Sequence, residues 1–400
     1  MKSVYLCEFV RTPIGRFAGA LCRVRADDLA ARPLQELLRR HPDLADSVDE
    51  VCLGSTNQAG EDNRNVARMA LLLAGLPETV PGITVNRLCS SGLDAVAAAT
   101  RAIRLGEAEL LIAGGVESMS RAPFVMAKAG NAFSRTFEMH DSTIGWRFIN
   151  PRLKEQYGVD SMPETAENVA AECGVSREDQ DAFAVRSQER TERARASGTL
   201  AGEIVAVEAP AGKKGSVTVS SDEHPRPGTT LAALAGLRPI VRPDGTVTAG
   251  NASGINDGAA AMILASEAAV ARLGLQPLVR VTGFASAGLA PRVMGLGPVA
   301  AVQKLLARLQ WKISDVDVIE INEAFAAQSL PCLRQLGLPD DAEHVNANGG
   351  AIALGHPLGM SGARITGVAA RELARRGGKR ALATMCVGVG QGVALALEAA

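Results

Sequence analysis

The chain has 400 residues, enough for two or three hydrophobic cores, and its 47% hydrophobic and 21% charged residues are typical of an ordinary globular protein. A net charge of −1 provides no field that would gather nucleic acid or an anionic membrane surface. The seven cysteines include no C-x-x-C pair, which argues against a zinc knuckle, a thioredoxin-type site and a secreted disulfide framework.

The two ends of the chain show no targeting signal. Charged Lys2 and Glu8 come too early for the apolar core of a signal peptide, and no apolar run approaches the length of a membrane span. The C-terminal Leu-Glu-Ala-Ala is not a peroxisomal address. We therefore expect a cytoplasmic protein with no membrane partner and no nucleic-acid partner.

The first part of the chain alternates apolar runs with amphipathic segments. Residues 51–54 form an apolar run typical of a buried strand, and residues 93–103 place apolar side chains at helical spacing. A polar break at 106–109 leads into a second apolar run at 110–113. Strands that alternate with helices predict an α/β protein whose mostly parallel sheets are covered on both faces.

Cys89 stands before Ser90, Ser91 and Gly92 and the helical segment, which predicts a position near a helix N-terminus. There the helix dipole and the free backbone N–H groups favour a thiolate and lower the pKa of a cysteine by about one unit or more. Cys89 is therefore a candidate nucleophile. A buried structural cysteine is the alternative that its local context leaves open.

Residues 123–254 show a less regular pattern than the two parts of the chain that flank them. Prolines punctuate this segment, and residues 164–172 and 177–196 are its predicted helices. Because the segment is too long for a simple loop, it is predicted to be a lid or a substrate-binding insertion.

The last part of the chain repeats the order of the first. An apolar run at 318–321, a helical segment through 365–373 and a second apolar run at 381–385 follow one another, and a Val-Asn pair precedes the helix in both halves (85–86 and 345–346). A repeat of this length indicates duplicated domains rather than a solenoid. The alternative explanation is that α/β proteins in general alternate strands and helices in this order.

His356 lies between Gly355 and Pro357, in a turn that fixes its backbone. Imidazole is the natural acceptor of a thiol proton near neutral pH. His356 is therefore a candidate general base, and a helix-capping or core histidine is the alternative.

Cys386 follows an apolar run and enters glycines at 388, 390 and 392. Such glycines let a backbone approach a ligand closely and aim an N–H group at a developing oxyanion. Their G-x-G-x-G spacing differs from the G-x-G-x-x-G of a dinucleotide fold. Cys386 is a candidate for moving protons, and a buried cysteine before a turn is the alternative.

Two further segments carry amides. Asn322 follows the run 318–321, where its amide could orient a water or donate to an oxyanion. The turn at 251–258 is equally consistent with a ligand-binding turn and with a loop between domains.

Taken together, the segments from Arg11-Thr12-Pro13-Ile14-Gly15 to the glycines after Cys386 resemble the thiolase family over nearly the whole chain. The resemblance implies a five-layered α-β-α-β-α fold, built from two duplicated βαβαβαββ domains and a loop domain that binds coenzyme A. On this chain the domains would be residues 1–122, to which 255–275 returns, the loop domain 123–254, and residues 276–400.

The resemblance also implies a role for each candidate residue. Cys89 would be the acylated nucleophile, and His356 would activate it and help to polarise the thioester oxygen. Cys386 would protonate the departing acetyl-CoA enolate and deprotonate the incoming coenzyme A. Asn322 would hold a water in one oxyanion hole, and the N–H groups of Cys89 and Gly388 would form the other. No metal or permanently bound cofactor is needed, because coenzyme A is a co-substrate.

Four more residues align with family positions around coenzyme A. Arg226 suits adenine stacking or a phosphate, and the hydroxyl of Ser253 can hydrogen-bond the pantetheine arm. Met162 and Phe325 would line the pantetheine tunnel, with plain core packing as the alternative. The resemblance also implies a homo-oligomer, either a dimer or a dimer of dimers (a homotetramer).

The insertion departs from short-chain acetoacetyl-CoA thiolases, which carry His-Met where this chain has Ser161-Met162. The amino-acid sequence of the insertion, together with residues 223–227 and 355–360, is similar to that of 3-oxoadipyl-CoA (β-ketoadipyl-CoA) thiolases. These enzymes act in bacterial degradation of aromatic compounds.

A 3-oxoadipyl substrate ends in a carboxylate, for which a cationic partner is expected. Arg147 is the first candidate, with Arg135 and Lys154 behind it. A solvated surface charge is the alternative for each of the three.

The expected reaction is therefore the cleavage of 3-oxoadipyl-CoA with coenzyme A to succinyl-CoA and acetyl-CoA through a Cys89 acyl-enzyme. The first alternative is an acetyl-CoA C-acetyltransferase of short-chain or broad specificity. A ketoacyl synthase is more distant, because it would need a histidine in place of Cys386. An inactive coenzyme A or lipid-binding protein should have lost Cys89 or His356. The direction of the reaction and the choice between dimer and tetramer stay open.

Overall fold

A computed structural model describes residues 1–400, apart from the side chain of Lys214. The first part of the chain contains β1 (Val4–Arg11), β2 (Gly15–Arg16), α1 (Ala26–Arg40), β3 (Glu50–Gly54), α2 (Val66–Ala74), β4 (Gly82–Val85), α3 (Ser91–Leu105) and β5 (Leu110–Ser118). The middle contains β6 (Phe124–Met126), β7 (Met139–Asp141), α4 (Pro151–Tyr157), α5 (Met162–Cys173), α6 (Arg177–Ala196), β8 (Val207–Pro210), β9 (Ser216–Val219) and α7 (Leu231–Ala235). The last part contains β10 (Asn256–Ser266), α8 (Glu267–Leu273), β11 (Val279–Gly288), α9 (Gly297–Leu309), β12 (Val318–Ile321), α10 (Ala326–Gln335), α11 (Ala351–Leu354), α12 (Leu358–Arg376), β13 (Arg380–Val387) and β14 (Gln391–Ala399).

The strands form two half-sheets that meet between β1 and β11. The strand order is β12-β13-β14-β11-β1-β10-β5-β3-β4. Only two residue pairs, Tyr5 with Arg280 and Leu6 with Val279, join β1 to β11. The strands of the βα units are parallel in each half, β3 with β5 and β12 with β13. The prediction of mostly parallel sheets is nevertheless wrong, because β10 pairs antiparallel with β1 and β5, and β14 pairs antiparallel with β11 and β13.

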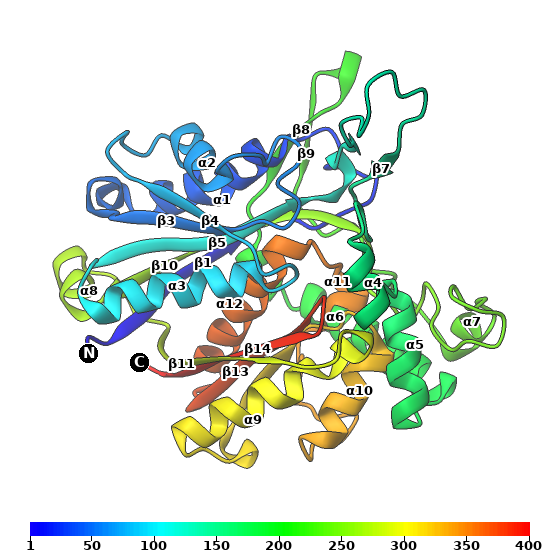
Figure 1. The fold of residues 1–400 in the computed structure, drawn as a ribbon. Helices are drawn as coiled ribbons and strands as arrows, with labels where there is room; N and C mark the ends of the chain where they lie inside the picture. Colours follow the sequence, from blue (N-terminus) through cyan, green and yellow to red (C-terminus); the bar gives the residue numbers. More distant parts are fainter.

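Helices and half-sheets alternate in five layers (Figure 1). Helices α3 and α12 lie between the half-sheets, α1 and α2 cover the outer face of one, and α9 and α10 cover the outer face of the other. Strands β5 and β10 are buried along their whole length, because helices cover both of their faces and neighbouring strands pair with both of their edges. The five-layered α-β-α-β-α fold expected from the sequence is confirmed.

The predicted repeat extends to details of hydrogen bonding. In the first half, the Asp49 carboxylate accepts bonds from the backbone N–H groups of Glu109 and Leu110, 2.7 and 3.0 Å away. In the second half, the Asp317 carboxylate accepts bonds from Lys379 and Arg380 in the same way, at 2.6 and 3.0 Å. An aspartate thus fixes the start of the neighbouring strand in both halves.

The two central helices cross at glycines. A Cβ atom on Gly92, in the first turn of α3, would lie 2.6 Å from the carbonyl oxygen of Gly359 in the first turn of α12. A Cβ atom on Gly359 would in turn lie 2.8 Å from the carbonyl oxygen of Gly54, where β3 ends. Because no side chain separates these backbones, the residues just before the two helices, including Cys89 and His356, are held close to the same point.

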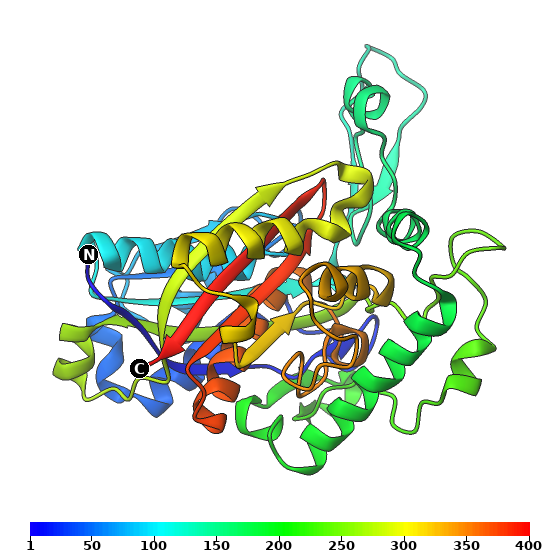
Figure 2. The same cartoon turned by 90° about the horizontal axis from the view of Figure 1, so that it is seen from below.

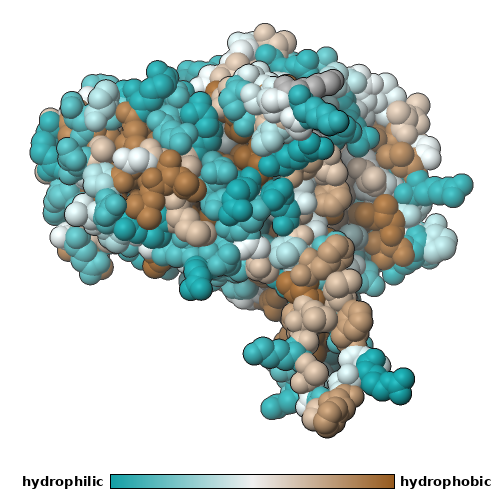
Figure 3. Space-filling view, turned by 90° about the horizontal axis from the view of Figure 1, so that it is seen from above, coloured by the Kyte–Doolittle hydropathy of each residue, from teal (hydrophilic) through white to brown (hydrophobic). Residues whose placement is uncertain are grey.

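The middle segment forms an irregular region beside the layers. Figure 2 shows the part around β6 and β7 extending away from the body of the molecule, and Figure 3 shows apolar side chains gathered on a projecting part. We call residues 124–149 the arm. Its large exposed apolar side chains are Phe124, Met126, Phe133, Phe137, Met139, Ile144, Phe148 and Ile149.

Candidate active site

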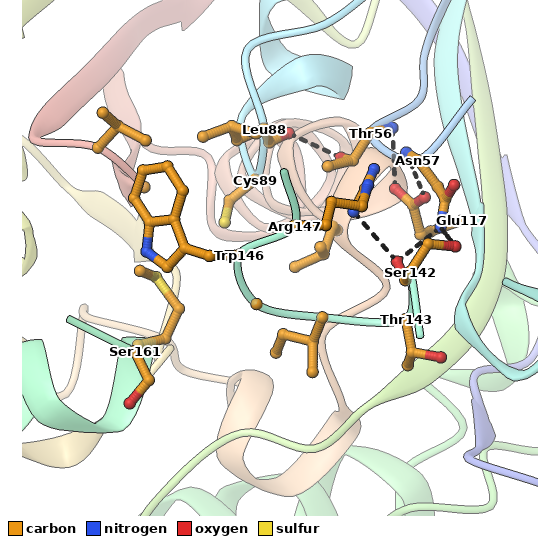
Figure 4. A pocket seen from close by; sticks show the side chains of 16 residues that line it. Thr56, Asn57, Leu88, Cys89, Glu117, Ser142, Thr143, Trp146, Arg147 and Ser161 are labelled. Atoms are coloured by element: carbon orange, nitrogen blue, oxygen red, sulfur yellow. Dashed lines mark hydrogen bonds between the residues drawn. The ribbon is translucent and has the colours of Figure 1, made fainter. Parts of the chain in front are cut away.

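A cavity of about 210 Å³ opens at the N-terminal ends of the central helices (Figure 4). Four residues singled out in the sequence, Cys89, Gly388, Met162 and Arg147, line it. Leu358, two positions after His356, lines it as well. The fold therefore brings together segments that are almost three hundred residues apart in the chain.

Cys89 lies on a tight turn just before α3. The preceding Leu88 has a positive φ of 49°, which is uncommon for a residue other than glycine. The hydroxyl of Ser91 fixes this turn, since it accepts a bond from the N–H of Arg87 at 3.0 Å and donates to the carbonyl of Leu88 at 2.6 Å. Strained turns of this kind concentrate at functional sites.

The predicted position of Cys89 near a helix N-terminus is confirmed, but the predicted lowering of its pKa is wrong. Burial raises the pKa of Cys89 to about 11, although the backbone N–H groups of Gly388 and of Cys89 itself oppose that rise. Desolvation of a thiolate therefore outweighs the favourable dipoles. At neutral pH the Cys89 side chain is therefore a thiol.

This pKa gives a prediction for chemical modification. The rate of alkylation of Cys89 by iodoacetamide should rise about tenfold per pH unit from neutral pH to about pH 10, because only the thiolate reacts. Mass spectrometry of the Cys89 peptide at each pH measures that rate. A plateau near pH 7 would show instead that Cys89 has the lowered pKa of an activated cysteine.

His356 is a buried neutral imidazole whose tautomer is fixed by Ser361. The Ser361 hydroxyl lies 2.8 Å from the carbonyl of Pro357, to which it can only donate, and 2.6 Å from Nδ1 of His356. Ser361 must then accept a hydrogen bond from Nδ1–H. Nε2 is therefore the unprotonated nitrogen of His356.

Nε2 of His356 faces the amide of Asn322. The Asn322 Nδ2 group donates to it across 3.3 Å. The Oδ1 atom of Asn322 is buried and has no hydrogen-bond partner among the described residues. A buried polar atom of this kind typically binds a water, and here that water would lie beside the His356 imidazole.

The pKa of His356 is far below its ordinary value. Burial, and after it the positive charge of the buried Arg364, lowers this pKa to about 3. The backbone of His356 is held by Asn256, whose Oδ1 accepts its N–H at 2.9 Å. Asn256 also donates to the carbonyl of Gly15 at 2.9 Å, so it connects the His356 turn to the first strands of the chain.

Cys386 lies in β13 and is 1% exposed. Burial, and after it the neighbouring Cys89, raises the pKa of Cys386 well above its usual range. The turn after β13 brings Gly388 to the cavity, where a Cβ atom would lie 3.1 Å from Leu88 Cδ1. The N–H group of Gly388 points toward the Cys89 sulfur.

The structure separates the residues predicted to contact coenzyme A. Met162 begins α5 and lines the cavity. Phe325 is 8% exposed and pairs with Ala252, beside Ser253, whose N–H donates to the carbonyl of Ala324 at 2.9 Å. Phe325 and Ser253 therefore adjoin each other without lining the Cys89 cavity.

Arg226 lies at a different place. It lines a second cavity of about 570 Å³, together with Arg16, Glu223 and His224. Its backbone N–H donates to the side chain of Gln188 at 2.9 Å. Arg226 therefore does not line the cavity that Cys89 lines.

Arg147 points along the wall of the Cys89 cavity, as Figure 4 shows. Its NH1 group donates to the backbone carbonyl of Ser142 at 3.4 Å, and its guanidinium forms no salt bridge with any described carboxylate. Arg135 and Lys154 do not line this cavity. Of the three cations considered, Arg147 is therefore the one placed to meet a ligand.

Three residues that contact or line the site were not singled out in the sequence. Glu117, Asn256 and Ser361 carry no local signal, because each acts through bonds to segments distant in the chain or to the backbone of a turn. For Asn256, its place within the Asn-rich turn at 251–258 was the one available hint.

All seven cysteines are free. Among the described side chains, no group of three or more His, Cys, Asp or Glu is placed to hold a metal ion. None of the described helices is long and apolar enough to cross a membrane.

Comparison with known proteins covers the whole chain. Residues 4–268 match the family model "Thiolase, N-terminal domain", and residues 275–399 match "Thiolase, C-terminal domain". The chain is 65% identical over 398 residues to the β-ketoadipyl-CoA thiolase of Pseudomonas aeruginosa, covering 99% of both chains. It is 64% identical over 400 residues to the 3-oxoadipyl-CoA/3-oxo-5,6-dehydrosuberyl-CoA thiolase of Escherichia coli, covering 100% of both.

Two solved structures share the fold over the full length. The crystal structure of the Bacillus anthracis acetyl-CoA acetyltransferase has a TM-score of 0.93 at 42% identity and covers 100% of this chain and 99% of its own. Human mitochondrial 3-ketoacyl-CoA thiolase in complex with CoA has a TM-score of 0.91 at 39% identity, with coverages of 100% and 98%.

Proposed function

The chain belongs to the thiolase family, and on that premise we propose that it cleaves 3-oxoadipyl-CoA with coenzyme A to acetyl-CoA and succinyl-CoA. The observation that carries this proposal is one cavity that holds a thiol, the N–H of Gly388 and an arginine without an acidic partner. The first two suit acyl transfer, and the arginine suits a substrate that ends in a carboxylate.

Acylation begins with attack of the Cys89 sulfur on the keto carbon C3 of the substrate. The thiol proton passes to Nε2 of His356 as the C–S bond forms, and the keto oxygen becomes an alkoxide. Breakage of the C2–C3 bond then releases the acetyl-CoA enolate, and Cys386 donates its thiol proton to the enolate carbon. The succinyl group stays on Cys89 as a thioester.

Deacylation reverses the proton transfers. The Cys386 thiolate takes the proton of an incoming coenzyme A, and the coenzyme A thiolate attacks the succinyl thioester. Cys89 leaves and recovers its proton from His356. The water at Asn322 and the N–H groups of Cys89 and Gly388 stabilise the two oxyanions, a type of contribution worth about 10²-fold or more in rate.

The resting protonation states support these assignments. Cys386 has to be a protonated acid when the enolate departs, and burial keeps it so. His356 has to be an unprotonated base when Cys89 attacks, and its low pKa keeps it neutral. Neither residue needs to change its resting state before the substrate binds.

We assign the substrate carboxylate to Arg147. Replacing Arg147 with alanine should lower kcat/KM for 3-oxoadipyl-CoA by about 10- to 100-fold, the effect of losing a charge-assisted hydrogen bond. Acetoacetyl-CoA lacks the carboxylate, so its kcat/KM should change by less than about twofold. Arg135→Ala and Lys154→Ala are matched controls, since neither residue lines the cavity. Equal losses for both substrates would contradict the assignment.

The alternative is an acetyl-CoA C-acetyltransferase of short-chain or broad specificity. Steady-state thiolysis of 3-oxoadipyl-CoA and of acetoacetyl-CoA by the unaltered protein discriminates the two. We expect the higher kcat/KM with 3-oxoadipyl-CoA. A preference for acetoacetyl-CoA would overturn the substrate assignment and leave the acyl-transfer chemistry intact.

Coenzyme A is proposed to enter past Met162, Phe325 and Ser253, with Arg226 reaching its adenine or phosphate end. Residues 123–254 would form the loop domain for this ligand, between the domain 1–122 with 255–275 and the domain 276–400. The place of β10 between β1 and β5 supports the return of 255–275 to the first domain.

We also propose a homo-oligomer in the cytoplasm. The arm exposes eight large apolar side chains, more than a monomer usually leaves in one region, and a second copy of the chain would cover them. Seven free cysteines suit a reducing compartment. Light scattering of the purified protein distinguishes monomer, dimer and tetramer.

A further inference from the structure

Glu117 lies at the centre of the site although it takes no part in the proposed chemistry. It comes from β5, is 2% exposed and lines the Cys89 cavity. No described cation forms a salt bridge with it. A buried carboxylate without a cation is costly, so its polar contacts have to offset that cost.

Backbone N–H groups from two segments provide those contacts. The loop after β3 donates from Thr56 and Asn57 at 3.0 and 3.1 Å, and α12 donates from Gly359 at 2.8 Å. Burial raises the pKa of Glu117 to about 7, and these donors oppose that rise.

The bond to Gly359 gives α12 the cap that its own sequence does not provide. The residue before the helix is Pro357, which makes no side-chain cap. Glu117 therefore reaches across from the sheet and places a carboxylate at the helix N-terminus, where negative charge is favourable. The residue next to Pro357 is His356, so this contact fixes the turn that presents the imidazole.

The bonds to the loop reach the other two parts of the site. The Thr56 hydroxyl donates to the carbonyl of Leu88, next to the nucleophile, at 3.1 Å. The Asn57 amide donates to the carbonyl of Ser142 at 2.8 Å, and the same carbonyl accepts the bond from Arg147. Figure 4 shows both chains of contacts converging on the Glu117 carboxylate.

We propose that Glu117 is a positioning residue. It holds three parts of the site at fixed relative positions: the turn with His356, the turn with Cys89 and the part of the cavity wall with Arg147. The proposal rests on the proposed function, since the relative position of these three parts matters only if His356 takes the proton of Cys89. Glu117 touches no reacting atom in this scheme. Its effect passes through the backbone groups that its two oxygens hold.

Glu117→Gln and Glu117→Ala test the proposal. Glutamine keeps the volume but turns one acceptor into a donor, so one N–H contact is lost, and alanine loses all of them. We expect kcat to fall about 10-fold for Glu117→Gln and about 100-fold or more for Glu117→Ala, while KM for coenzyme A changes by less than about twofold. Asp317→Asn is the matched control, because it also removes a carboxylate that accepts two backbone N–H groups. Asp317 lies just before β12, at the end of that strand opposite Asn322.

A second readout separates positioning from a general loss of stability. The chain has five histidines, so ¹⁵N spectra of histidine-labelled protein resolve the Nδ1–H tautomer of His356. The His356 signals should shift in both Glu117 variants and stay unchanged in Asp317→Asn. Unchanged signals together with a kcat within about twofold of the unaltered protein would overturn the proposal. An unaltered protein that forms no acyl-Cys89 would refute the proposed function instead, and the spectra would still report on Glu117.

Discussion

Replacing Cys89 with alanine is expected to lower kcat/KM for thiolysis by about 10⁴-fold or more, because no other group can carry the acyl intermediate. Cys386 is 1% exposed and burial raises its pKa well above its usual range, so it is not a substitute nucleophile. Thiolysis of 3-oxoadipyl-CoA, followed by chromatography of the coenzyme A esters, measures the loss. Cys22→Ala, which removes a partly exposed cysteine outside the cavity, should keep full activity.

The same variant provides the control for trapping the intermediate. When the unaltered protein is incubated with 3-oxoadipyl-CoA and free coenzyme A is withheld, the Cys89 peptide should gain the mass of one succinyl group. The Cys89→Ala protein should gain none. Substantial turnover by Cys89→Ala, or an acyl group on a different residue, would contradict the assigned nucleophile.

Replacing His356 with glutamine is expected to lower kcat by about 10³-fold, within the range of a lost general base. Glutamine retains polar contacts near Ser361 and Asn322 but has no basic nitrogen to accept the thiol proton. Steady-state thiolysis at saturating coenzyme A measures the change. His41→Gln, at the end of α1 and away from the cavity, is the matched control.

The pH dependence of the residual rate tests why activity is lost. Without an imidazole, attack has to wait for the Cys89 thiolate, whose pKa is about 11. The residual rate should therefore rise about tenfold per pH unit up to about pH 10. The unaltered protein should show a much flatter profile near neutral pH, because its base takes the proton during attack. A flat profile in His356→Gln would show that another group serves as the base.

Both variants examine one electrostatic feature. Burial moves the pKa of Cys89 up to about 11 and that of His356 down to about 3, so a preformed thiolate–imidazolium pair is negligibly populated. Both side chains are therefore neutral in the free protein. In the proposed mechanism, proton transfer accompanies formation of the C–S bond, and the charge that develops on oxygen meets N–H groups already in place.

Much of the fold could be read from periodicity and turn residues. The apolar runs at 51–54, 318–321 and 381–385 lie in β3, β12 and β13. These elements were predictable because their apolar residues are set by local burial patterns. The short β1–β11 junction was not predictable, since only two residue pairs make it and no pattern marks them.

The electrostatics of the site could not be derived in the same way. The sequence placed Cys89 at a helix N-terminus, from which a lowered pKa follows. It did not reveal how deeply the sulfur would be desolvated, and that cost decides the sign of the shift. Glu117 escaped detection for a related reason, because its partners are backbone N–H groups that every sequence contains.

The sequence by itself indicated which chemical groups are proposed to carry the reaction: a cysteine before a helix, a histidine in a rigid turn and a second cysteine before glycines. These depend on local residue types and spacing. Only the tertiary structure gave the burial that sets their protonation states, the position of Arg147 at the Cys89 cavity, and the contacts of Glu117 on which its proposed role rests. Each of these depends on burial and on contacts between distant segments, which exist only when the two halves of the chain close around the central helices.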